Sequence, residues 1–106
     1  MKLTLREYLS ADGRSYFQEW LDSLPVPVRA RIQARIFRFE TGNLGDHMSV
    51  GEGVWEARVM FGPGCRVYFG KEGRSIILLL LGGDKSSQAG DIRKARQLWK
   101  EYLEDK

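Results

Sequence analysis

Three basic side chains and one phenol are the residues whose types and spacing best suit chemistry in this chain. Arg58, Arg66 and Tyr68 fall on two segments that are predicted to pair as a β-hairpin, and Lys85 follows directly after a third apolar segment. Guanidinium groups bind phosphate oxygens in pairs, and a phenol can donate a hydrogen bond. We therefore treat Arg58, Arg66, Tyr68 and Lys85 as candidate catalytic residues for a reaction at a phosphodiester.

RNA suits such a site because its own 2′-hydroxyl can act as the nucleophile. The protein then has to supply orientation and stabilise the extra charge on a pentacoordinate phosphate. The sequence contains no G-x-S-x-G or H-E-x-x-H motif, and its single Cys and single His do not form a zinc-binding pattern. We expect no metal and no cofactor. The alternative interpretation of the same spacing is an ordinary solvated sheet face on which Glu56 pairs with Arg58.

A second basic group follows a helical spacing. Arg31, Arg35 and Arg38 each stand one position before an apolar residue of a predicted helix, so they should form a stripe beside its buried face. Phosphate contacts from such a stripe give affinity without reading sequence, which makes these three arginines candidate RNA-binding residues. An ordinary solvated helix face is the alternative.

Length and composition are those of one globular domain, residues 1–106. The chain has 17 Lys and Arg against 14 Asp and Glu, a net charge of +3, and 42% apolar residues, which argues against a disordered chain. Its longest apolar run, Ile76–Leu81, is far shorter than the ~20 residues of a membrane-spanning helix. Charges interrupt the first residues, so we expect no signal peptide, no membrane partner and a cytoplasmic location.

The elements that must position the candidate residues follow from hydrophobic periodicity. Residues 54–69 alternate between apolar and polar side chains around a turn at Gly62–Gly64, which predicts a hairpin. Its expected cross-strand pairs are Phe61 with Cys65, Met60 with Arg66, and Arg58 with Tyr68. One face of the hairpin is then apolar, and the other carries the candidate arginines and the phenol.

The remaining segments complete an α+β domain. They are an opening strand within 3–9, helices within 15–24 and 27–39, a polar loop at 42–53, a strand at 76–81 covered on both faces, and a final helix after Ser87. The expected order is strand, helix, helix, strand, strand, strand, helix. We therefore predict a mainly antiparallel sheet of about four strands, with an N-terminal helical hairpin and a C-terminal helix.

Several ordered motifs resemble a known family. They are Gly53-Val54-Trp55-Glu56-Ala57-Arg58, Gly62-Pro63-Gly64-Cys65-Arg66-Val67-Tyr68-Phe69, Leu79-Leu80-Leu81-Gly82-Gly83-Asp84-Lys85-Ser86-Ser87-Gln88 and Asp91-Ile92-Arg93-Lys94-Ala95. Together they resemble the phage-derived addiction module killer protein (HigB-like) branch of the RelE/ParE toxin superfamily. The resemblance extends over nearly the whole chain.

The resemblance implies the toxin of a type II toxin–antitoxin pair. RelE-like members cleave mRNA on the ribosome without a metal, so the implied partners are mRNA, the ribosome and a cognate helix-turn-helix antitoxin. Arg66 matches a recurrent catalytic arginine of the superfamily, and Arg58 and Lys85 match flanking basic positions more loosely. The alternatives are a ParE-like gyrase inhibitor without nuclease activity, or a non-toxic partner of a DNA-binding antitoxin.

Two positions depart from the pattern of this branch. The branch often has a lysine in the loop before the hairpin, where this chain has Asp46-His47-Met48-Ser49, and commonly a tyrosine where this chain has Cys65. Loss of the loop cation would weaken RNA binding or cleavage. No conspicuous tyrosine follows Lys85, so any catalytic role of a tyrosine falls to Tyr68.

Overall fold

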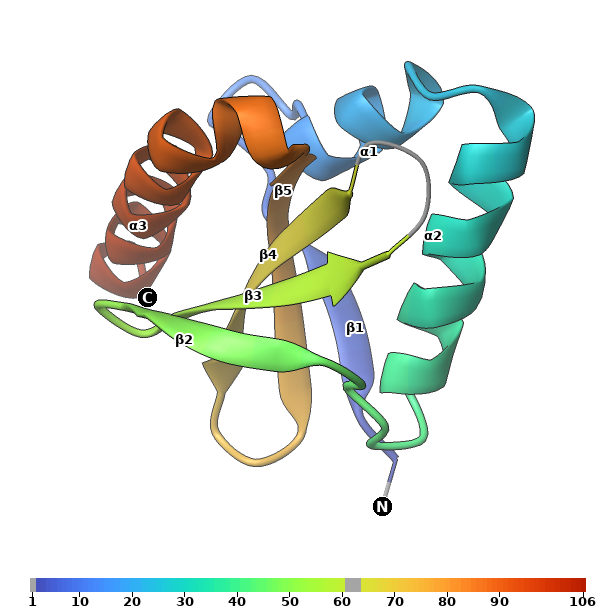
Figure 1. Cartoon of the computed structure of the whole chain (residues 1–106). Helices are drawn as coiled ribbons and strands as arrows, with labels where there is room; N and C mark the ends of the chain where they lie inside the picture. The colour runs from blue at the N-terminus through green and yellow to red at the C-terminus, as the bar shows by residue number, and fades with distance from the viewer. Residues whose placement is uncertain (1, 61–63) are drawn as a thin grey trace.

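A single β-sheet lies between helices packed on its two faces (Figure 1). The computed structural model describes residues 2–60 and 64–106. Within these residues the elements are β1 (Thr4–Glu7), α1 (Tyr16–Asp22), α2 (Val26–Phe39), β2 (His47–Gly51), β3 (Val54–Val59), β4 (Cys65–Glu72), β5 (Ile76–Gly83), the 3-10 turn η1 (Lys85–Ser87) and α3 (Gln88–Glu104). The mixed α+β class, the N-terminal helical hairpin and the C-terminal helix are as the sequence predicted.

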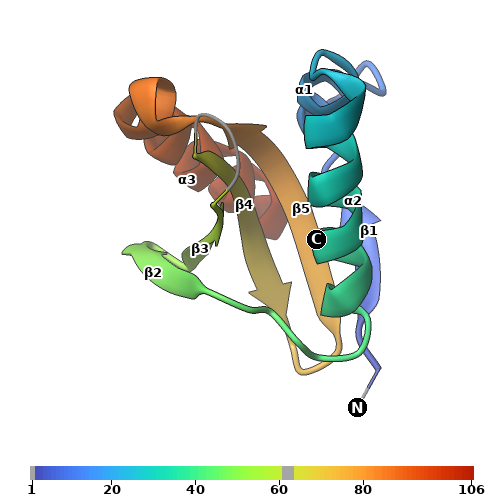
Figure 2. The same ribbon diagram turned by 45° about the vertical axis from the view of Figure 1, so that its right-hand side comes forward.

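The strands lie in the order β1-β5-β4-β3-β2. β1 runs parallel to β5, and the other three pairings are antiparallel. Helices α1 and α2 cover one face of the sheet and α3 covers the other, an arrangement that is clearest when the molecule is turned (Figure 2). The candidate catalytic side chains on β3 and β4 therefore share their face of the sheet with α3.

The helices begin where the sequence supplies suitable residues. Ser15 caps α1, and its hydroxyl oxygen accepts a hydrogen bond from the backbone N–H of Gln18 at 3.1 Å. Pro27 lies in the first turn of α2, where its missing N–H costs no helical hydrogen bond. Ile32 and Phe39, on the apolar stripe of α2, are fully buried against the sheet.

Strand β2 corrects the prediction for residues 42–53, which were expected to be a polar loop. His47–Gly51 pairs antiparallel with β3 at the edge of the sheet, so the observed sheet has five strands in the described residues, where about four were expected. An edge strand needs no continuous apolar face, and two β2 side chains, those of Met48 and Ser49, are exposed. Its pairing also shifts between Ser49 and Gly51, which removes the alternation that would have indicated a strand.

Two glycines at the end of β5 allow helices to approach both faces of the sheet. A Cβ atom on Gly82 would lie 2.1 Å from the Trp20 ring of α1, and one on Gly83 would lie 1.8 Å from a carboxylate oxygen of Asp91 in α3. No side chain fits at these distances, so glycine is required at both positions. The first turn of α3 is thereby held against the end of β5, next to the candidate catalytic residues on β4.

Candidate functional site

The β3–β4 hairpin has a different register from the expected one. The observed pairs are Val59 with Cys65, Arg58 with Arg66, and Glu56 with Tyr68, in place of the three expected pairs. The expected register is wrong by two residues, because Cys65 pairs with Val59, two positions before the residue expected opposite it. Side chains alternate with a period of two, so this shift leaves the described residues on their expected faces. Phe61, which was expected to pair with Cys65, lies outside the described residues.

The observed register brings the two hairpin arginines directly opposite each other. Arg58 of β3 pairs with Arg66 of β4, and Arg66 pairs in turn with Gly83 of β5. The Cα atoms of directly paired residues in antiparallel strands are only about 5 Å apart. Two guanidinium groups so close repel each other unless a negative charge lies between them.

Glu56 supplies that charge from the same face of β3, with its side chain fully buried. Its Oε1 accepts a hydrogen bond from Nε of Arg58 at 3.1 Å. Its Oε2 accepts hydrogen bonds from the Tyr68 hydroxyl at 3.1 Å and from the Gln88 amide at 2.9 Å, and it lies 3.6 Å from Nε of Arg66. One carboxylate therefore connects β3, β4 and the first residue of α3. The Glu56–Arg58 pair expected from the sequence is present, but the face that holds it is covered, not solvated.

The same contacts shift the acidity of Glu56 and Tyr68 in opposite directions. Burial alone would raise the pKa of Glu56, but the hydrogen bonds from Gln88, Arg58 and Tyr68 and the charge of Arg66 outweigh it and hold that pKa below its ordinary value. Burial, together with the Glu56 charge and hydrogen bond, raises the pKa of Tyr68 well above its ordinary value of 10.0. At neutral pH the pair is a carboxylate that accepts from a protonated phenol.

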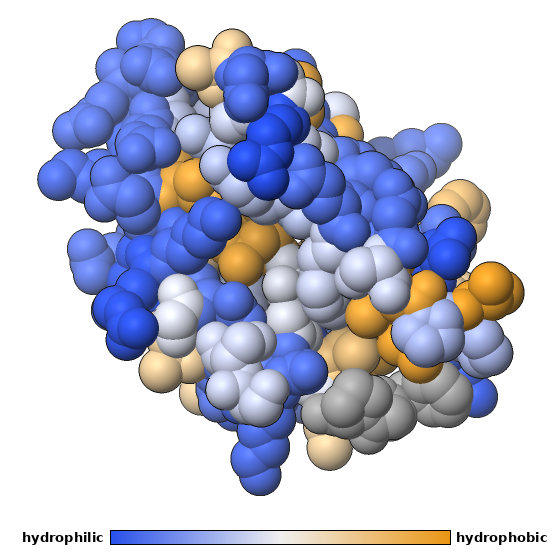
Figure 3. Space-filling model, turned by 90° about the horizontal axis from the view of Figure 1, so that it is seen from above, coloured by the Kyte–Doolittle hydropathy of each residue, from blue (hydrophilic) through white to orange (hydrophobic). Residues whose placement is uncertain are grey.

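The outer ends of both guanidinium groups point away from Glu56. Arg58 is 38% exposed and donates from Nη2 to the thioether sulfur of Met48 at 3.3 Å, whereas Arg66 is 10% exposed and donates from Nη1 to the carbonyl of Gly64 at 2.9 Å. Met48 is 47% exposed, so a thioether side chain lies at the surface beside Arg58. Seen from above, this end of the molecule is mostly hydrophilic, with apolar groups between the polar ones (Figure 3).

Lys85 lies in the turn η1, two residues after Gly83, and is exposed. Arg58, Arg66 and Gly83 form one row of paired residues across the sheet. Lys85 comes two residues after the end of this row. Asp84 caps η1 by accepting hydrogen bonds from the backbone N–H and hydroxyl of Ser86, which, with a smaller effect of the Arg66 charge, lower the pKa of Asp84. The structure thus places Arg58, Arg66 and Lys85 at one end of the sheet.

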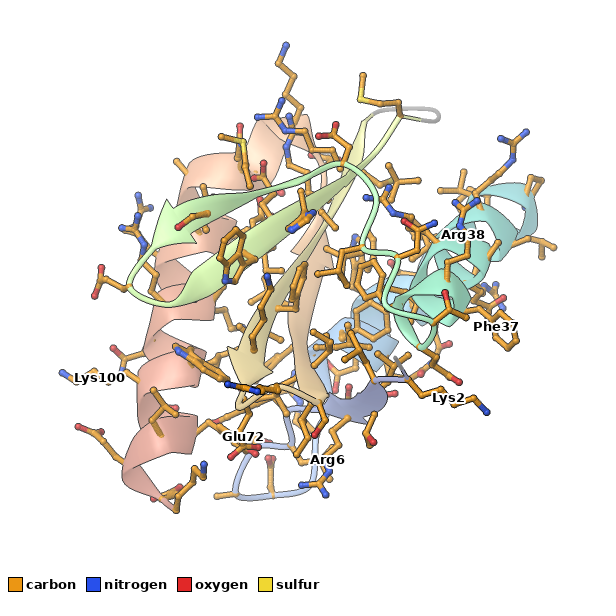
Figure 4. All side chains as sticks on the ribbon, turned by 90° about the horizontal axis from the view of Figure 1, so that it is seen from below. Lys2, Arg6, Phe37, Arg38, Glu72 and Lys100 are labelled. Atoms are coloured by element: carbon orange, nitrogen blue, oxygen red, sulfur yellow. The ribbon has the colours of Figure 1, made fainter. Side chains whose placement is uncertain are left out.

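The arginine stripe of α2 is on the other face of the sheet and is not one continuous surface. Arg31 and Arg38 are exposed, and Figure 4 shows Arg38 projecting from the end of α2 beside Phe37. Arg35 is buried, at 8% exposure, so the prediction that it lies on a solvent-facing stripe with the other two is wrong.

Arg35 is buried because it binds backbone carbonyls of the neighbouring segments. Its Nη2 donates to the carbonyls of Leu44 at 2.9 Å and Asp46 at 2.8 Å, and its Nη1 donates to the carbonyl of Arg58 at 2.5 Å. The backbone N–H of Arg58 in turn donates to the Asp46 carbonyl at 3.0 Å. Arg35 therefore fixes the loop before β2 and the end of β3.

Sequence reasoning missed two residues of this arrangement. Glu56 was considered only as an ion-pair partner of Arg58, although an acid on a face shared with two arginines was a signal that it holds both. Gln88 is close to Glu56 only because α3 packs against β5, and nothing in the local sequence indicates that contact.

Residues 2–60 and 64–106 contain neither a cluster of metal ligands nor a membrane-spanning helix. In this part of the chain, no three His, Cys, Asp or Glu side chains are grouped so that they could hold a metal ion. None of the helices in the same residues is long and apolar enough to cross a membrane.

Comparisons with known proteins give matches over most of the chain. The model of the family described as phage-derived protein Gp49-like matches residues 19–100. An uncharacterized protein of Haemophilus influenzae is 43% identical over 86 residues, which cover 80% of this chain and 87% of the relative. The matched region includes α2, the β3–β4 hairpin, β5 and most of α3.

Proposed function

This chain belongs to the family of phage-derived Gp49-like proteins, which falls in the RelE- and HigB-type toxin class, and on that premise we propose that it is a ribosome-dependent mRNA endonuclease. In this proposal it is the toxin of a type II toxin–antitoxin pair and is neutralised by a helix-turn-helix antitoxin. Cleavage requires no metal.

The observation that carries the proposal is the direct pairing of Arg58 and Arg66 around the buried carboxylate of Glu56. Both guanidinium groups face the carboxylate through Nε, and among the described residues Nη1 of Arg58 and Nη2 of Arg66 make no hydrogen bond and could bind a phosphate. Rigid strands hold these groups more closely than loops would, as stabilisation of a transition state requires. Lys85, at the end of the same row, adds a third cation.

In the proposed reaction the 2′-oxygen of one nucleotide forms a bond to phosphorus while the bond from phosphorus to the 5′-oxygen of the next nucleotide breaks. The 2′-hydroxyl releases its proton to water, and the departing 5′-oxygen takes a proton from water. The products are a 2′,3′-cyclic phosphate and a 5′-hydroxyl. Arg58 and Arg66 orient the phosphate and stabilise the charge that develops on its oxygens, and Lys85 contributes to binding.

The test is inducible expression without an antitoxin, followed within minutes by mapping of the 5′ ends of cellular mRNA. We expect cuts inside translated frames that disappear when initiation is blocked. Growth arrest with intact mRNA would instead indicate a ParE-like gyrase inhibitor, and absence of arrest would indicate a non-toxic partner of an antitoxin.

Arg66→Ala is the matching variant. Loss of a cation at the developing charge should lower cleavage about 100-fold and relieve growth arrest. Arg93→Ala, at an exposed position of α3, removes the same charge away from the cluster and should leave cleavage unchanged. A folded Arg66→Ala protein that cleaves at the wild-type rate would contradict the assignment of Arg66.

A further inference from the structure

We propose that Glu56 is a positioning residue for Arg58 and Arg66, and that Gln88 fixes the orientation of the Glu56 carboxylate. Because Gln88 belongs to α3, this orientation depends on how α3 packs against the sheet. Glu56 itself does not touch the substrate in this inference. It turns the guanidinium groups of Arg58 and Arg66 so that their terminal nitrogens face a phosphate. The inference rests on the proposed function and deepens it.

Arg58 and Arg66 repel each other and need a negative charge between them. Arg58 and Arg66 occupy directly paired positions, and the Arg66 side chain is nine-tenths buried. A buried cation needs a counter-charge, and two adjacent cations without one would separate towards solvent. Glu56 is within ion-pair distance of both, at 3.1 Å from Arg58 and 3.6 Å from Arg66. Its charge therefore keeps two mutually repelling groups at one end of the sheet.

Glu56 also decides which guanidinium nitrogens of Arg58 and Arg66 are engaged. Glu56 lies nearest to Nε of each arginine, and the terminal nitrogens make their contacts elsewhere. Nη2 of Arg58 contacts the sulfur of Met48, a weak acceptor that a phosphate oxygen displaces readily, whereas Nη1 of Arg66 donates to the Gly64 carbonyl. The carboxylate thus leaves the terminal nitrogens of Arg58 in position to bind phosphate oxygens, with Arg66 held directly beside them.

The Glu56 carboxylate is itself held by hydrogen bonds from two elements. Tyr68 and Gln88 both donate to Oε2 of Glu56, from β4 and from α3. Gln88 is the first residue of α3, whose first turn is held by the 2.5 Å hydrogen bond from Ser87 to Asp91 and by the close approach of Asp91 to Gly83. A carboxylate fixed from two elements has one orientation, and it passes that orientation to the arginines.

Replacing Glu56 should affect RNA cleavage without weakening RNA binding. Glu56→Gln removes a buried negative charge beside the two arginines, so RNA should bind as tightly as to the wild type or more tightly. The arginines lose the group that orders them, so cleavage at saturating substrate should fall about 30-fold or more. A residue that only supported the fold would lower binding and cleavage together.

The experiment measures single-turnover cleavage of mRNA on programmed ribosomes by the full chain at increasing protein concentration. Glu56→Gln should lower the maximal rate without raising the half-saturating concentration. Gln88→Ala, at a half-buried position, should retain the fold and lower the maximal rate about fivefold, since one hydrogen bond to the carboxylate is lost. Glu104→Gln makes the same charge change at an exposed position of α3 and should match the wild type.

A second measurement follows the arginines without any substrate. In the wild type, the Nε–H signals of Arg58 and Arg66 in proton–nitrogen NMR spectra should be resolved and slow to exchange with water, and in Glu56→Gln both should collapse towards the signals of exposed arginines. The inference is overturned if these signals do not change, if Glu56→Gln cleaves within about twofold of the wild type, or if binding and cleavage fall in parallel. Absence of cleavage by the wild type would refute the proposed function instead, and the NMR signals would still decide whether Glu56 orders the arginines.

Discussion

At the scale of single residues, the position of Tyr68 defines what its phenol can do. The side chain is fully buried, and its hydroxyl donates to Glu56. Its raised pKa keeps the phenol protonated at neutral pH. Tyr68 therefore suits the task of holding Glu56, and in the proposed function Arg58, Arg66 and Lys85 are the residues that bind RNA.

Tyr68→Phe tests this division of roles. The variant leaves a buried carboxylate oxygen with one donor fewer, so the free energy of unfolding should fall by about 1–3 kcal/mol. Cleavage per folded molecule should fall less than tenfold. Urea unfolding and cleavage assays at matched folded concentration check both values, and complete loss of cleavage in a folded variant would show that the phenol reacts.

Met48→Lys tests the effect of the missing loop cation. Met48 is 47% exposed, pairs with Glu56 across the β2–β3 pairing, and contacts Arg58. A lysine there should tighten binding to single-stranded RNA and increase the slope of log affinity against log salt by about 0.7. Binding measured from 50 to 300 mM salt, roughly the range in which counterion release dominates, gives this slope. An unchanged slope would mean that the new cation contacts no phosphate.

At the scale of elements, α2 carries one buried and one exposed arginine about one turn apart. Arg35 binds carbonyls of the loop before β2 and of the end of β3, so it attaches the helix to the strand that carries Arg58. Burial and the nearby positive charge of Arg38 lower the pKa of Arg35, and the three carbonyls compensate for the lost hydration of its guanidinium. Arg38, one turn later, remains at the surface (Figure 4).

Alanine variants of Arg35 and Arg38 test whether the buried arginine stabilises the fold and the exposed one does not. Arg35→Ala leaves several carbonyls without their charged donor and should lower the free energy of unfolding by about 3 kcal/mol. Arg38→Ala should change it by less than about 0.5 kcal/mol. Thermal and urea unfolding check the difference, and equal effects of the two variants would contradict the assignment of Arg35 to the fold.

At the scale of the whole molecule, the sheet separates two apolar clusters, one under α1 and α2 and one under α3. The charged residues Glu56, Arg58 and Arg66 lie on the α3 face. The cluster on the α3 face contains Tyr68, Leu80 and Trp99, and the fully buried Glu56 accepts a hydrogen bond from the Tyr68 hydroxyl. An ionised group in such a place links the stability of the fold to pH.

Glu56 should therefore contribute to acid unfolding. Its pKa in the folded state lies below the ordinary value of 4.5, so its contribution is fully present above that value and is lost as the pH falls through the folded-state pKa. Urea unfolding from about pH 7 to pH 3 should show a smaller loss of stability in Glu56→Gln than in the wild type. Glu104→Gln should follow the wild-type curve, and identical curves for all three proteins would contradict the shift.

The sequence by itself determined the features that depend on local periodicity. The alternation at 54–59 and 65–69 assigned the side chains of the described hairpin residues to their correct faces, and the spacing of Ile32 and Phe39 identified the buried face of α2. The unbroken apolar run at Ile76–Leu81 indicated a strand covered on both faces, and β5 contributes to both apolar clusters. These features are predictable because a period of two or 3.6 residues is set within the segment itself.

The tertiary structure alone decided which groups meet. The hairpin register depends on where pairing stops around a turn, and the strand β2 depends on a neighbour that completes its hydrogen bonds. Arg35 binds carbonyls 9 to 23 residues away, and Gln88 reaches Glu56 across 32 residues. Contacts at such separations arise from the packing of elements, and no local pattern encodes them. The contacts of Arg35 with β3 and of Gln88 with Glu56 therefore became visible only in the folded chain, whereas the pairing of Glu56 with Arg58 could be expected from the sequence.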